Sequence, residues 1–351
     1  MHWTHIHPDF KLNGQTYTIA EFTTLAQQYL QSTQENERDF GQLILDWFNE
    51  SPLMTVQTSG TTGTPKRIQI EKKQMINSAR ATTDFFDLQA QDSALLCMPV
   101  KYIAGKMMWI RALVSGLHID LVNPSSKPLQ NTEKHYDFVA MVPLQVENSL
   151  PELHRVKTLL IGGAKLDDTL RKKLLDLPTA CYETYGMTET ITHIAAKKIE
   201  ETHFSALPNV SFSTDDRTCL VIDAPNVSRQ TITTNDIVRL IDDKHFEWLG
   251  RIDNVINSGG VKIFPEKIEN ILVDKISQRF FIAGMPDKHL GQKVILVIEG
   301  SASPIDDRLF ESLHPYERPK NIFFIKQFTE TPTGKIKRKQ MVEELMNEAM
   351  G

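Results

Sequence analysis

The chain has 351 residues, of which 40% are hydrophobic and 24% charged, a composition typical of a globular protein with room for two or three domains. Its 39 basic and 44 acidic residues give a formal net charge of −5, so no overall basic field indicates a nucleic-acid or anionic-membrane partner. The three cysteines are widely spaced, no signal-peptide pattern opens the chain and no apolar run is long enough for a membrane span, so we expect a cytoplasmic protein without a cysteine–metal cluster.

Residues up to about 250 are expected to form a large α/β unit with a small β subdomain at its end. Two helical stretches, 20–29 and 40–48, form a lead-in. From residue 54 on, short apolar runs alternate with helical patterns, which is typical of a layered sheet whose ligand sites gather near the strand ends. The expected strands are 94–98, 119–122, 138–142, 158–161 and 180–184, and the expected helices are 72–86, 106–117, 143–150 and 167–175.

The pattern becomes rich in short strands after residue 210. The polar stretch 250–254 then predicts a boundary between a first domain, residues 1–250, and a compact α/β module, residues 254–351. The expected strands before the boundary are 220–222, 231–233, 236–241 and 246–249, with a hairpin turn between the last two. After it we expect a hairpin at 255–264, a helix from 265 to about 275, strands at 280–283 and 293–299, and a helix following residue 334.

The stretch 58–66 is the most distinctive motif of the chain. It reads Thr-Ser-Gly-Thr-Thr-Gly-Thr-Pro-Lys between an apolar run at 53–56 and an alternating segment at 67–70, so we expect a loop between two strands. Glycines allow close approach of the backbone, hydroxyls donate hydrogen bonds and the lysine adds a positive charge, which suits a nucleotide triphosphate. A polar hairpin turn is the structural alternative. The binding residues would be Thr58, Ser59, Gly60, Thr61, Thr62, Gly63, Thr64 and Lys66.

The same stretch is not a Walker A motif. That motif has four residues between its glycines and ends in Gly-Lys-Ser/Thr, whereas Gly60 and Gly63 are three positions apart and Pro65 precedes Lys66. The segment after it alternates as a strand does and does not continue as a helix. A P-loop ATPase or a kinase is therefore disfavoured.

Two turns that follow predicted strands carry residues suited to a nucleotide. The small residues 162–164 would let a flat ring lie against the backbone, although on its own this stretch is better explained as a simple strand-to-helix turn. After the next strand, Tyr185 suits stacking on a base, and Gly186 permits a tight turn. Thr188 suits a phosphate or carboxylate oxygen, and Glu189 suits Mg²⁺ beside phosphate. A strand-end turn with a solvated glutamate is the alternative.

Two further features carry charge at defined places. Asp236 and Arg251 flank the predicted hairpin, where a carboxylate accepts both hydroxyls of a ribose and an arginine caps the sugar or a phosphate. A structural ion pair across the hairpin is the alternative. Lys335 follows a Pro/Gly turn that fixes its position, so it suits delivery to a negatively charged reaction centre, whereas 337–339 reads as a solvated face.

Together and in this order, the motifs resemble the adenylate-forming superfamily of acyl- and aryl-CoA ligases, luciferases and peptide-synthetase adenylation domains. The resemblance covers about residues 54 to 340. It implies a large N-terminal α/β domain with a small β subdomain and a mobile C-terminal α+β domain, here N-terminally truncated because most of the family's subdomain ahead of 58–66 is missing. The chain is most similar to the o-succinylbenzoate–CoA ligases of menaquinone biosynthesis in its shortness, in Cys97-Met98-Pro99 with Gly105 and Trp109, and in the run 141–145 ahead of 159–164.

The resemblance also implies a function and a set of roles. With Mg²⁺, ATP would activate a carboxylic acid as an acyl-adenylate, and coenzyme A would then take the acyl group as a thioester. The 58–66 loop would hold the β- and γ-phosphates, and a hinge near 251–253, at Asp253, would let residues 254–351 rotate between the steps. The other implied roles are adenine contacts for Gly163, Ala164, Tyr185 and Gly186, ribose contacts for Asp236 and Arg251, catalysis by Lys335, Thr188 and Glu189, magnesium binding by Glu189, and passage of the thiol beside Gly259 and Gly260.

The chain departs from the family pattern at several positions, and rival functions stay open. Asn235 replaces the usual glycine before Asp236, Tyr102 stands where a histidine or aromatic is usual, and Thr192-His193 stands for Ser-Gln. The rivals are an acyl- or aryl-CoA ligase of another pathway, a carrier-protein-loading ligase, and a degenerate nucleotide-binding module without chemistry. The expected partners are ATP, coenzyme A and a small carboxylic acid, with no nucleic acid and no membrane span, and a homo-oligomer is possible.

Overall fold

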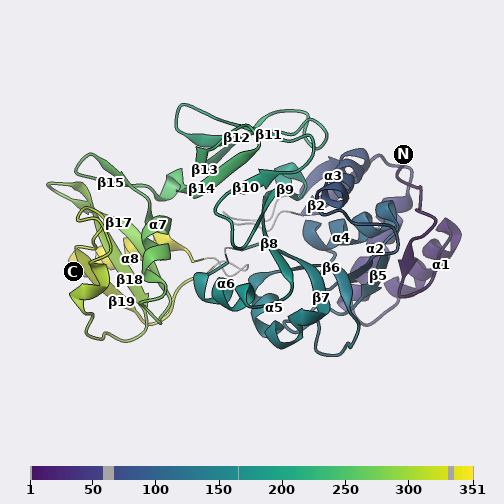
Figure 1. The fold of residues 1–351 in the computed structure, drawn as a ribbon, viewed down its shortest axis with the longest axis horizontal. Coiled ribbons are helices and arrows are strands. Elements are labelled where there is room, and N and C mark those ends of the chain that lie inside the picture. The colour runs from purple at the N-terminus through teal and green to yellow at the C-terminus, as the bar shows by residue number, and fades with distance from the viewer. Residues whose placement is uncertain (1, 58–66, 165, 331–335, 351) are drawn as a thin grey trace.

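The computed structural model describes residues 2–57, 67–164, 166–330 and 336–350, and builds them around a large sheet, a smaller C-terminal sheet and a two-stranded hairpin (Figure 1). The large sheet has twelve strands in the order β1-β5-β4-β6-β7-β8-β9-β10-β14-β13-β12-β11. Neighbours from β1 to β8 are parallel, and every pair beyond β8 is antiparallel. Its strands are β1 (Lys11–Leu12), β4 (Ser93–Leu96), β5 (His118–Leu121), β6 (Tyr136–Met141), β7 (Val156–Ile161), β8 (Ala180–Gly186), β9 (His193–Lys198), β10 (Phe204–Ala206), β11 (Ser211–Thr214), β12 (Cys219–Asp223), β13 (Ile232–Leu240) and β14 (His245–Arg251).

Helices cover both faces of the parallel part, which confirms the expected α/β class. Alternate strand residues point to opposite faces. Ala94, Leu96 and Phe138 therefore belong to one core, whereas Leu95 and Val139 belong to another. The first core is shared with α1 (Ile19–Leu30), α2 (Glu35–Phe48), α3 (Lys72–Phe85) and α4 (Ile103–Ser115), and the second with α5 (Pro143–Asn148), α6 (Asp168–Leu175) and the 3₁₀ turn η1 (Leu150–Arg155).

The strands and helices predicted between residues 72 and 184 are confirmed, with boundaries that differ by a few residues. The largest difference is at α4, which begins at Ile103 and not at 106. Gly105 lies in the first turn of this helix. Only glycine fits there, because a Cβ would be only 2.4 Å from the carbonyl oxygen of Pro99. The expected strands on either side of 58–66 are also confirmed, as the antiparallel pair β2 (Leu53–Gln57) and β3 (Arg67–Glu71).

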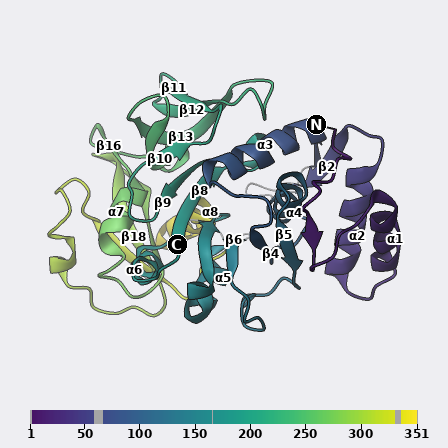
Figure 2. The same ribbon diagram turned by 45° about the vertical axis from the view of Figure 1, so that its right-hand side comes forward.

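The first fifty residues belong to the core, which corrects their prediction as a lead-in. Strand β1 extends the large sheet beside β5, and α1 and α2 lie at the end of the molecule away from the C-terminal sheet (Figure 2). Four aromatic rings of these helices stand edge-on around the indole of Trp109 on α4, with centroid separations between 5.8 and 6.3 Å. Such pairs add stability beyond the area they bury. The four rings are Phe22, Phe40, Trp47 and Phe48.

The small β subdomain was predicted with fewer strands than it has. The stretches 231–233 and 236–241 form the single strand β13, in which the register shifts between Ile237 and Val238. The polar residues Thr234 and Asn235 lie between those stretches and break the apolar alternation. Thr234 is nevertheless buried, as is Asp236 at the start of the second stretch. Strands β9, β10 and β11 were missed because short alanine- and serine-containing runs give little strand signal.

The C-terminal sheet has the order β16-β15-β18-β17, with β19 parallel to β18. Helix α7 packs through Ile268 and Leu272 on one face, and α8 packs through Met341 and Leu345 on the other. The predicted hairpin, helices and two strands are confirmed, whereas β19 was not predicted. The elements are β15 (Ile256–Ser258), β16 (Val261–Ile263), α7 (Pro265–Leu272), β17 (Phe280–Asp287), β18 (Gly291–Glu299), η4 (Asp307–Phe310), β19 (Asn321–Ile325) and α8 (Arg338–Met350).

The two sheets are joined along the chain by a short connection. The large sheet ends at Arg251, the C-terminal sheet begins at Ile256, and the 3₁₀ turn η3 (Ile252–Asn254) lies between them. A second contact is the ion pair of Lys172 on α6 with Asp274 after α7, at 2.5 Å. Within the described residues, no helix combines the length and the apolar character needed to cross a membrane.

Candidate functional site

The candidate site lies at the carboxyl ends of β7 and β8. These parallel neighbours pair Ile161 with Glu183, so Gly163, just beyond β7, and Tyr185, near the end of β8, lie at the same edge of the sheet. Open α/β sheets place their ligands beyond this edge, near a point where the strand pattern changes. Here the change is sharp, because β8 pairs with a parallel strand on one side and with the antiparallel β9 on the other.

The turn after β7 needs small residues. A Cβ at Gly162 would lie 2.6 Å from the hydroxyl of Thr184, which donates to the carbonyl of Ile161 at 3.1 Å. Gly163 has a φ of +81°, a conformation that disfavours residues other than glycine. Gly163 and Ala164 are exposed, so the backbone of this turn is open to a flat ligand.

Hydrogen bonds of the Thr190 side chain hold the turn after β8, and the side chains of the two preceding residues do not take part in them. The buried Thr190 hydroxyl accepts from the backbone N–H of Met187 and lies 2.7 Å from the carbonyl of Thr192. A Cβ at Gly186 would lie 2.3 Å from that carbonyl, so only glycine fits. The side chains of Thr188 and Glu189, in the 3₁₀ turn η2 (Thr188–Thr190), make no hydrogen bond or ion pair with a described residue and are available to a ligand.

Tyr185 and Asp236 are joined directly. The Tyr185 hydroxyl donates to Oδ2 of Asp236 at 2.7 Å, and the indole N–H of Trp248 donates to Oδ1 at 3.1 Å. The Tyr185 ring also meets Phe246 edge-on at 5.1 Å. Burial, with the Asp236 charge adding to it, raises the pKa of Tyr185 well above its ordinary value, so the phenol stays neutral.

Arg251 lies opposite Asp236 across the β13–β14 pair. Its Nη1 is 4.0 Å from Oδ1 of Asp236, whereas its Nη2 is 2.9 Å from Asp253. The alternative of a structural ion pair across the hairpin is therefore met only at the limit of contact distance. The exposed guanidinium stays accessible at the rim of the site.

Glu189 is the one predicted metal ligand. In the part of the chain that the structure describes, no cluster of three or more His, Cys, Asp or Glu side chains has the arrangement of a metal site. Mg²⁺ commonly binds through one or two carboxylates, substrate phosphates and waters. A single exposed carboxylate that is not paired with any described residue fits that way of binding.

Several predicted site residues are not placed beside this edge. The loop residues Thr58 to Lys66 and the predicted catalytic Lys335 lie outside the described residues. Gly259 and Gly260 form the exposed β15–β16 turn, with φ of +57° and +82°, and the Gly259 N–H donates to the carbonyl of Leu290. No hydrogen bond or ion pair between described residues joins that turn to the end of β8.

A buried polar cluster beside the β8 turn was missed from sequence. The guanidinium of Arg111 on α4 donates to Thr82 at 3.2 Å and to Thr192 at 3.1 Å, and Thr82 lies 3.1 Å from Nε2 of His193. Arg111 is only 2% exposed and has no carboxylate partner among the described residues. An arginine within the otherwise apolar run 107–114 of this helix was the signal that could have found it.

Both basic groups of this cluster are affected by burial. Burial lowers the pKa of Arg111 to about 9, which leaves it a cation at neutral pH. Burial, and then the charge of Arg111, lowers the pKa of His193 well below its usual value, so the ring is neutral. The cluster therefore presents one uncompensated buried positive charge.

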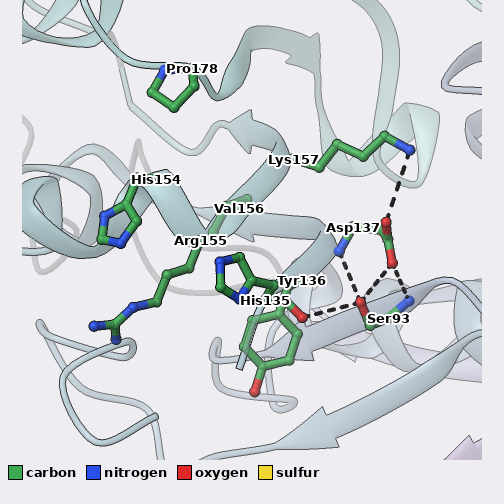
Figure 3. A pocket seen from close by; sticks show the side chains of 9 residues that line it. All are labelled: Ser93, His135, Tyr136, Asp137, His154, Arg155, Val156, Lys157 and Pro178. Atoms are coloured by element: carbon green, nitrogen blue, oxygen red, sulfur yellow. Dashed lines mark hydrogen bonds and ion pairs between the residues drawn. The ribbon is translucent and has the colours of Figure 1, made fainter. Parts of the chain in front are cut away.

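A separate cavity of about 200 Å³ opens at the amino ends of β6 and β7 (Figure 3). Its lining includes His154, Arg155 and Lys157, and Asp137 accepts hydrogen bonds from Ser93. Because parallel strands run from this edge toward the other, the cavity is at the opposite end of the sheet from the Tyr185 turn. None of the predicted site residues lines it.

The comparisons with known proteins agree with a nucleotide site built on an α/β sheet. The family model described as AMP-binding enzyme matches residues 11–229. The chain belongs to the AMP-binding enzyme family.

Two curated relatives illustrate its range. The chain is 25% identical to the 2-succinylbenzoate–CoA ligase of Lactococcus lactis, over 85% of this chain and 72% of the relative. It is 22% identical to the 3,4-dihydroxybenzoate–[aryl-carrier protein] ligase of Bacillus anthracis, over 86% of this chain and 76% of the relative.

Solved structures share the fold. An acyl-CoA synthetase (AMP-forming)/AMP-acid ligase II-like protein of Dyadobacter fermentans is 33% identical, with a TM-score of 0.63 over 92% of this chain and 98% of that one. The o-succinylbenzoate coenzyme A synthetase of Bacillus subtilis, in complex with ATP and magnesium, is 19% identical, with a TM-score of 0.70 over 88% of this chain and 77% of that one. The adenylate-forming fold expected from the motifs is thereby confirmed.

Proposed function

We propose that the protein is an AMP-forming acid–thiol ligase that joins coenzyme A to a carboxylic acid, and that the acid is 2-succinylbenzoate. Family membership supports the reaction class, and several relatives with that name, matched over more than four fifths of this chain, support the acid. All of its substrates are small metabolites, and we place the reaction in the cytoplasm.

The site residues divide between the parts of ATP. Gly163 and Ala164 would face adenine from one side because their turn is open, and Tyr185 would bound it from the neighbouring strand. Asp236 is fixed by two hydrogen bonds and still has lone pairs for the ribose hydroxyls, and Arg251 would close over the sugar from the rim. We assign the phosphates to the loop 58–66.

The chemistry requires two anions to meet. A carboxylate oxygen attacks the α-phosphorus of ATP, the bond to the bridging oxygen of the β-phosphate breaks, and pyrophosphate leaves. Lys335 would lie against the carboxylate and the α-phosphate, where its ammonium offsets their repulsion, and Thr188 would donate to the α-phosphate. Glu189 would hold the magnesium ion, which supplies further neutralisation of phosphate charge.

Arg111 is the observation that carries the choice of acid. 2-Succinylbenzoate has two carboxylates, and only one is activated, so the other must be held as an anion. A buried guanidinium without a carboxylate partner among the described residues, hydrogen-bonded to Thr192 three residues after Glu189, offers that charge. A monocarboxylic acid would leave Arg111 uncompensated, which costs free energy in a buried site.

The second step needs the thiol of coenzyme A to reach the adenylate. We propose that residues 254–351 rotate about a hinge at 251–253, which withdraws Lys335 and brings Gly259 and Gly260 to the thiol path. The absence of side chains at this turn leaves space for an extended thiol arm: apart from its chain neighbours, no described residue has an atom within 4 Å of a Cβ built on Gly260.

The experiment is a panel of acids with ATP, Mg²⁺ and coenzyme A, read by mass detection of AMP and thioester. The panel contains 2-succinylbenzoate, benzoate, coumarate and fatty acids, with a carrier protein as an alternative acceptor. We expect AMP and a coenzyme A thioester with 2-succinylbenzoate. Formation of AMP with another acid or acceptor would reassign the substrate, and absence of AMP with every acid would favour a nucleotide-binding module without chemistry.

A further inference from the structure

Glu266 is a buried carboxyl group at the contact between the large sheet and the C-terminal sheet. It lies in the first turn of α7, and its side chain is 5% exposed. Its Oε1 accepts a hydrogen bond from the Asn254 side chain at 2.6 Å. Its Oε2 is buried and has no hydrogen-bond partner in the residues described.

The unpaired Oε2 of Glu266 lies against β14 of the large sheet. A Cβ built on Gly250 in β14 would lie 2.5 Å from Oε2 of Glu266, so the two meet with no space for a side chain. Gly250 has a φ of +153°, which also favours glycine. Glu266 therefore packs across the connection at 251–255 and becomes exposed whenever α7 moves away from β14.

The charged groups around Glu266 do not neutralise it. Beyond the effect of burial, which raises the pKa of Glu266 most, Glu269 on the same helix raises it further and Arg338 of α8 lowers it. Both oxygens of Glu269 already hold Arg338, at 2.7 and 3.0 Å, so that cation is committed. On the β14 side, Arg251 pairs with Asp253. Burial is the largest cause of the raised pKa of Glu266, and the Asn254 hydrogen bond opposes it.

We propose that Glu266 is a proton-dependent positioning residue: its neutral acid form holds α7 against β14, and its ionisation favours release of that contact. Burying a neutral carboxylic acid costs much less free energy than burying an unpaired carboxylate at the same place, because the ion loses a far stronger hydration. The inference concerns the arrangement of the two sheets and does not depend on the acid, the acceptor or the reaction.

The direction of the pH effect follows from linkage. We call the arrangement in which α7 packs against β14 the contact arrangement. It binds the Glu266 proton more tightly than an arrangement in which the side chain is exposed. As pH rises from the ordinary glutamate pKa through the raised one, the contact arrangement loses stability relative to the exposed one, and above the raised pKa the difference is constant. Each unit by which the two pKa values differ changes the ratio of the arrangements by about tenfold.

Spin labels, one beside the large sheet and one beside the C-terminal sheet, test the proposed effect of pH on their arrangement directly. The substitutions Glu147→Cys on α5 and Ser301→Cys after β18 place labels on exposed residues of the two sheets, and the three native cysteines are buried. Distances are measured by double electron–electron resonance between about pH 5 and about pH 8. We expect the share of the contact distance to fall as pH rises in the wild-type background, and to stay at its low-pH value throughout in Glu266→Gln, which mimics the neutral acid.

Two controls make the result specific. Glu311→Gln neutralises an exposed glutamate that lies, like Glu266, in residues 254–351, and it is expected to leave the pH dependence intact. A pair of labels on two helices of the large sheet, at Lys73→Cys and Glu147→Cys, is expected to give one distance at every pH. A wild-type distribution that ignores pH, or a Glu266→Gln variant that follows pH as the wild type does, would overturn the proposal. The wild-type series stands alone if the variant fails to fold.

Discussion

The hydroxyl of Tyr185 donates a 2.7 Å hydrogen bond to Oδ2 of Asp236, although 51 positions separate the two residues in the chain. Tyr185 lies near the carboxyl end of β8, the last parallel strand, and Asp236 lies in the small β subdomain, so the bond ties the two halves of the nucleotide site together. With Trp248 on the other oxygen, the carboxylate is oriented before any ligand arrives.

Tyr185→Phe is expected to lower the free energy of unfolding by about 1–3 kcal/mol, because the carboxylate oxygen beneath it loses its partner. It should also weaken ATP binding, since Asp236 would then be less well oriented. Because the pKa of Tyr185 is raised, the wild-type bond should persist to alkaline pH. Urea unfolding and calorimetric titration with ATP measure both effects. Tyr182→Phe is the control, as the Tyr182 hydroxyl makes no hydrogen bond to a described residue; an equal loss in both variants would refute the role of the bond.

Lys335→Ala is expected to slow acyl-adenylate formation by about 10²–10³-fold, the usual effect of removing one preorganised charge contact. ATP should still bind, and a supplied acyl-adenylate should still react with coenzyme A, because Lys335 acts in the first step only. Carboxylate-dependent pyrophosphate release measures the first step. Lys337→Ala, at an exposed position two residues later, serves as control. Near-normal pyrophosphate release by Lys335→Ala would show that the assignment is wrong.

Asp253→Pro should slow thioester formation more than adenylation. The residue lies in η3 between the two sheets, and proline restricts the backbone rotation that a hinge requires. Single-turnover measurements of the two half-reactions separate the effects. Asp253→Ala removes the carboxylate that pairs with Arg251 and leaves the backbone free, so it should not show the same bias. Equal slowing of both half-reactions by proline would count against a hinge here.

Arg111→Met is expected to weaken use of 2-succinylbenzoate by about 10²-fold while the affinity for ATP is unchanged, because a buried charge pair with the second carboxylate is lost. The stability of the free protein should be equal or higher, since the variant no longer buries an unpaired cation. Steady-state kinetics with 2-succinylbenzoate and with benzoate make the comparison. Arg308→Met, at a largely exposed arginine, is the control. A matching loss with the monocarboxylic acid would remove Arg111 from the acid pocket.

Gly186→Ala is expected to cost about 3 kcal/mol of unfolding free energy, because the new Cβ would lie 2.3 Å from the carbonyl of Thr192 and 2.5 Å from the backbone of His193. Gly260→Ala should cost only about 1 kcal/mol, since that site has open space and only a positive φ to oppose a side chain. Urea unfolding of both variants gives the order. The reverse order would mean that the β8 turn relaxes easily.

The parts of the fold that were predictable from sequence are those with strong local patterns. The apolar runs of β4, β6 and β7 and the helices between them were predicted because a buried parallel strand is apolar on both faces. Strand β13 was predicted in two pieces because the polar residues Thr234 and Asn235 interrupt its pattern. The Thr234 hydroxyl accepts from the Asp236 N–H within the strand, and the Asp236 carboxylate is paired by Tyr185 from the distant strand β8.

The candidate site was predictable where a residue type carries its own chemistry, as with the open turn at 163–164 and Glu189, which no described residue pairs. Arg111 and Glu266 were not predicted. Their meaning arises from what surrounds them: an arginine or a glutamate on a helix is ordinarily solvated, and only the packing of α4 and α7 shows that these two are enclosed.

Trp248 differs from the other three tryptophans of the chain in where it stands. Trp47 and Trp109 are enclosed in the aromatic group at α4 and Trp3 lies beside Lys72, whereas the indole of Trp248 is hydrogen-bonded to the carboxylate assigned to ribose. The molecule thus carries its own optical reporter. Its emission at the nucleotide site can be followed without an added dye once the remote indoles are silenced, and occupancy can be read in the same sample in which turnover is measured.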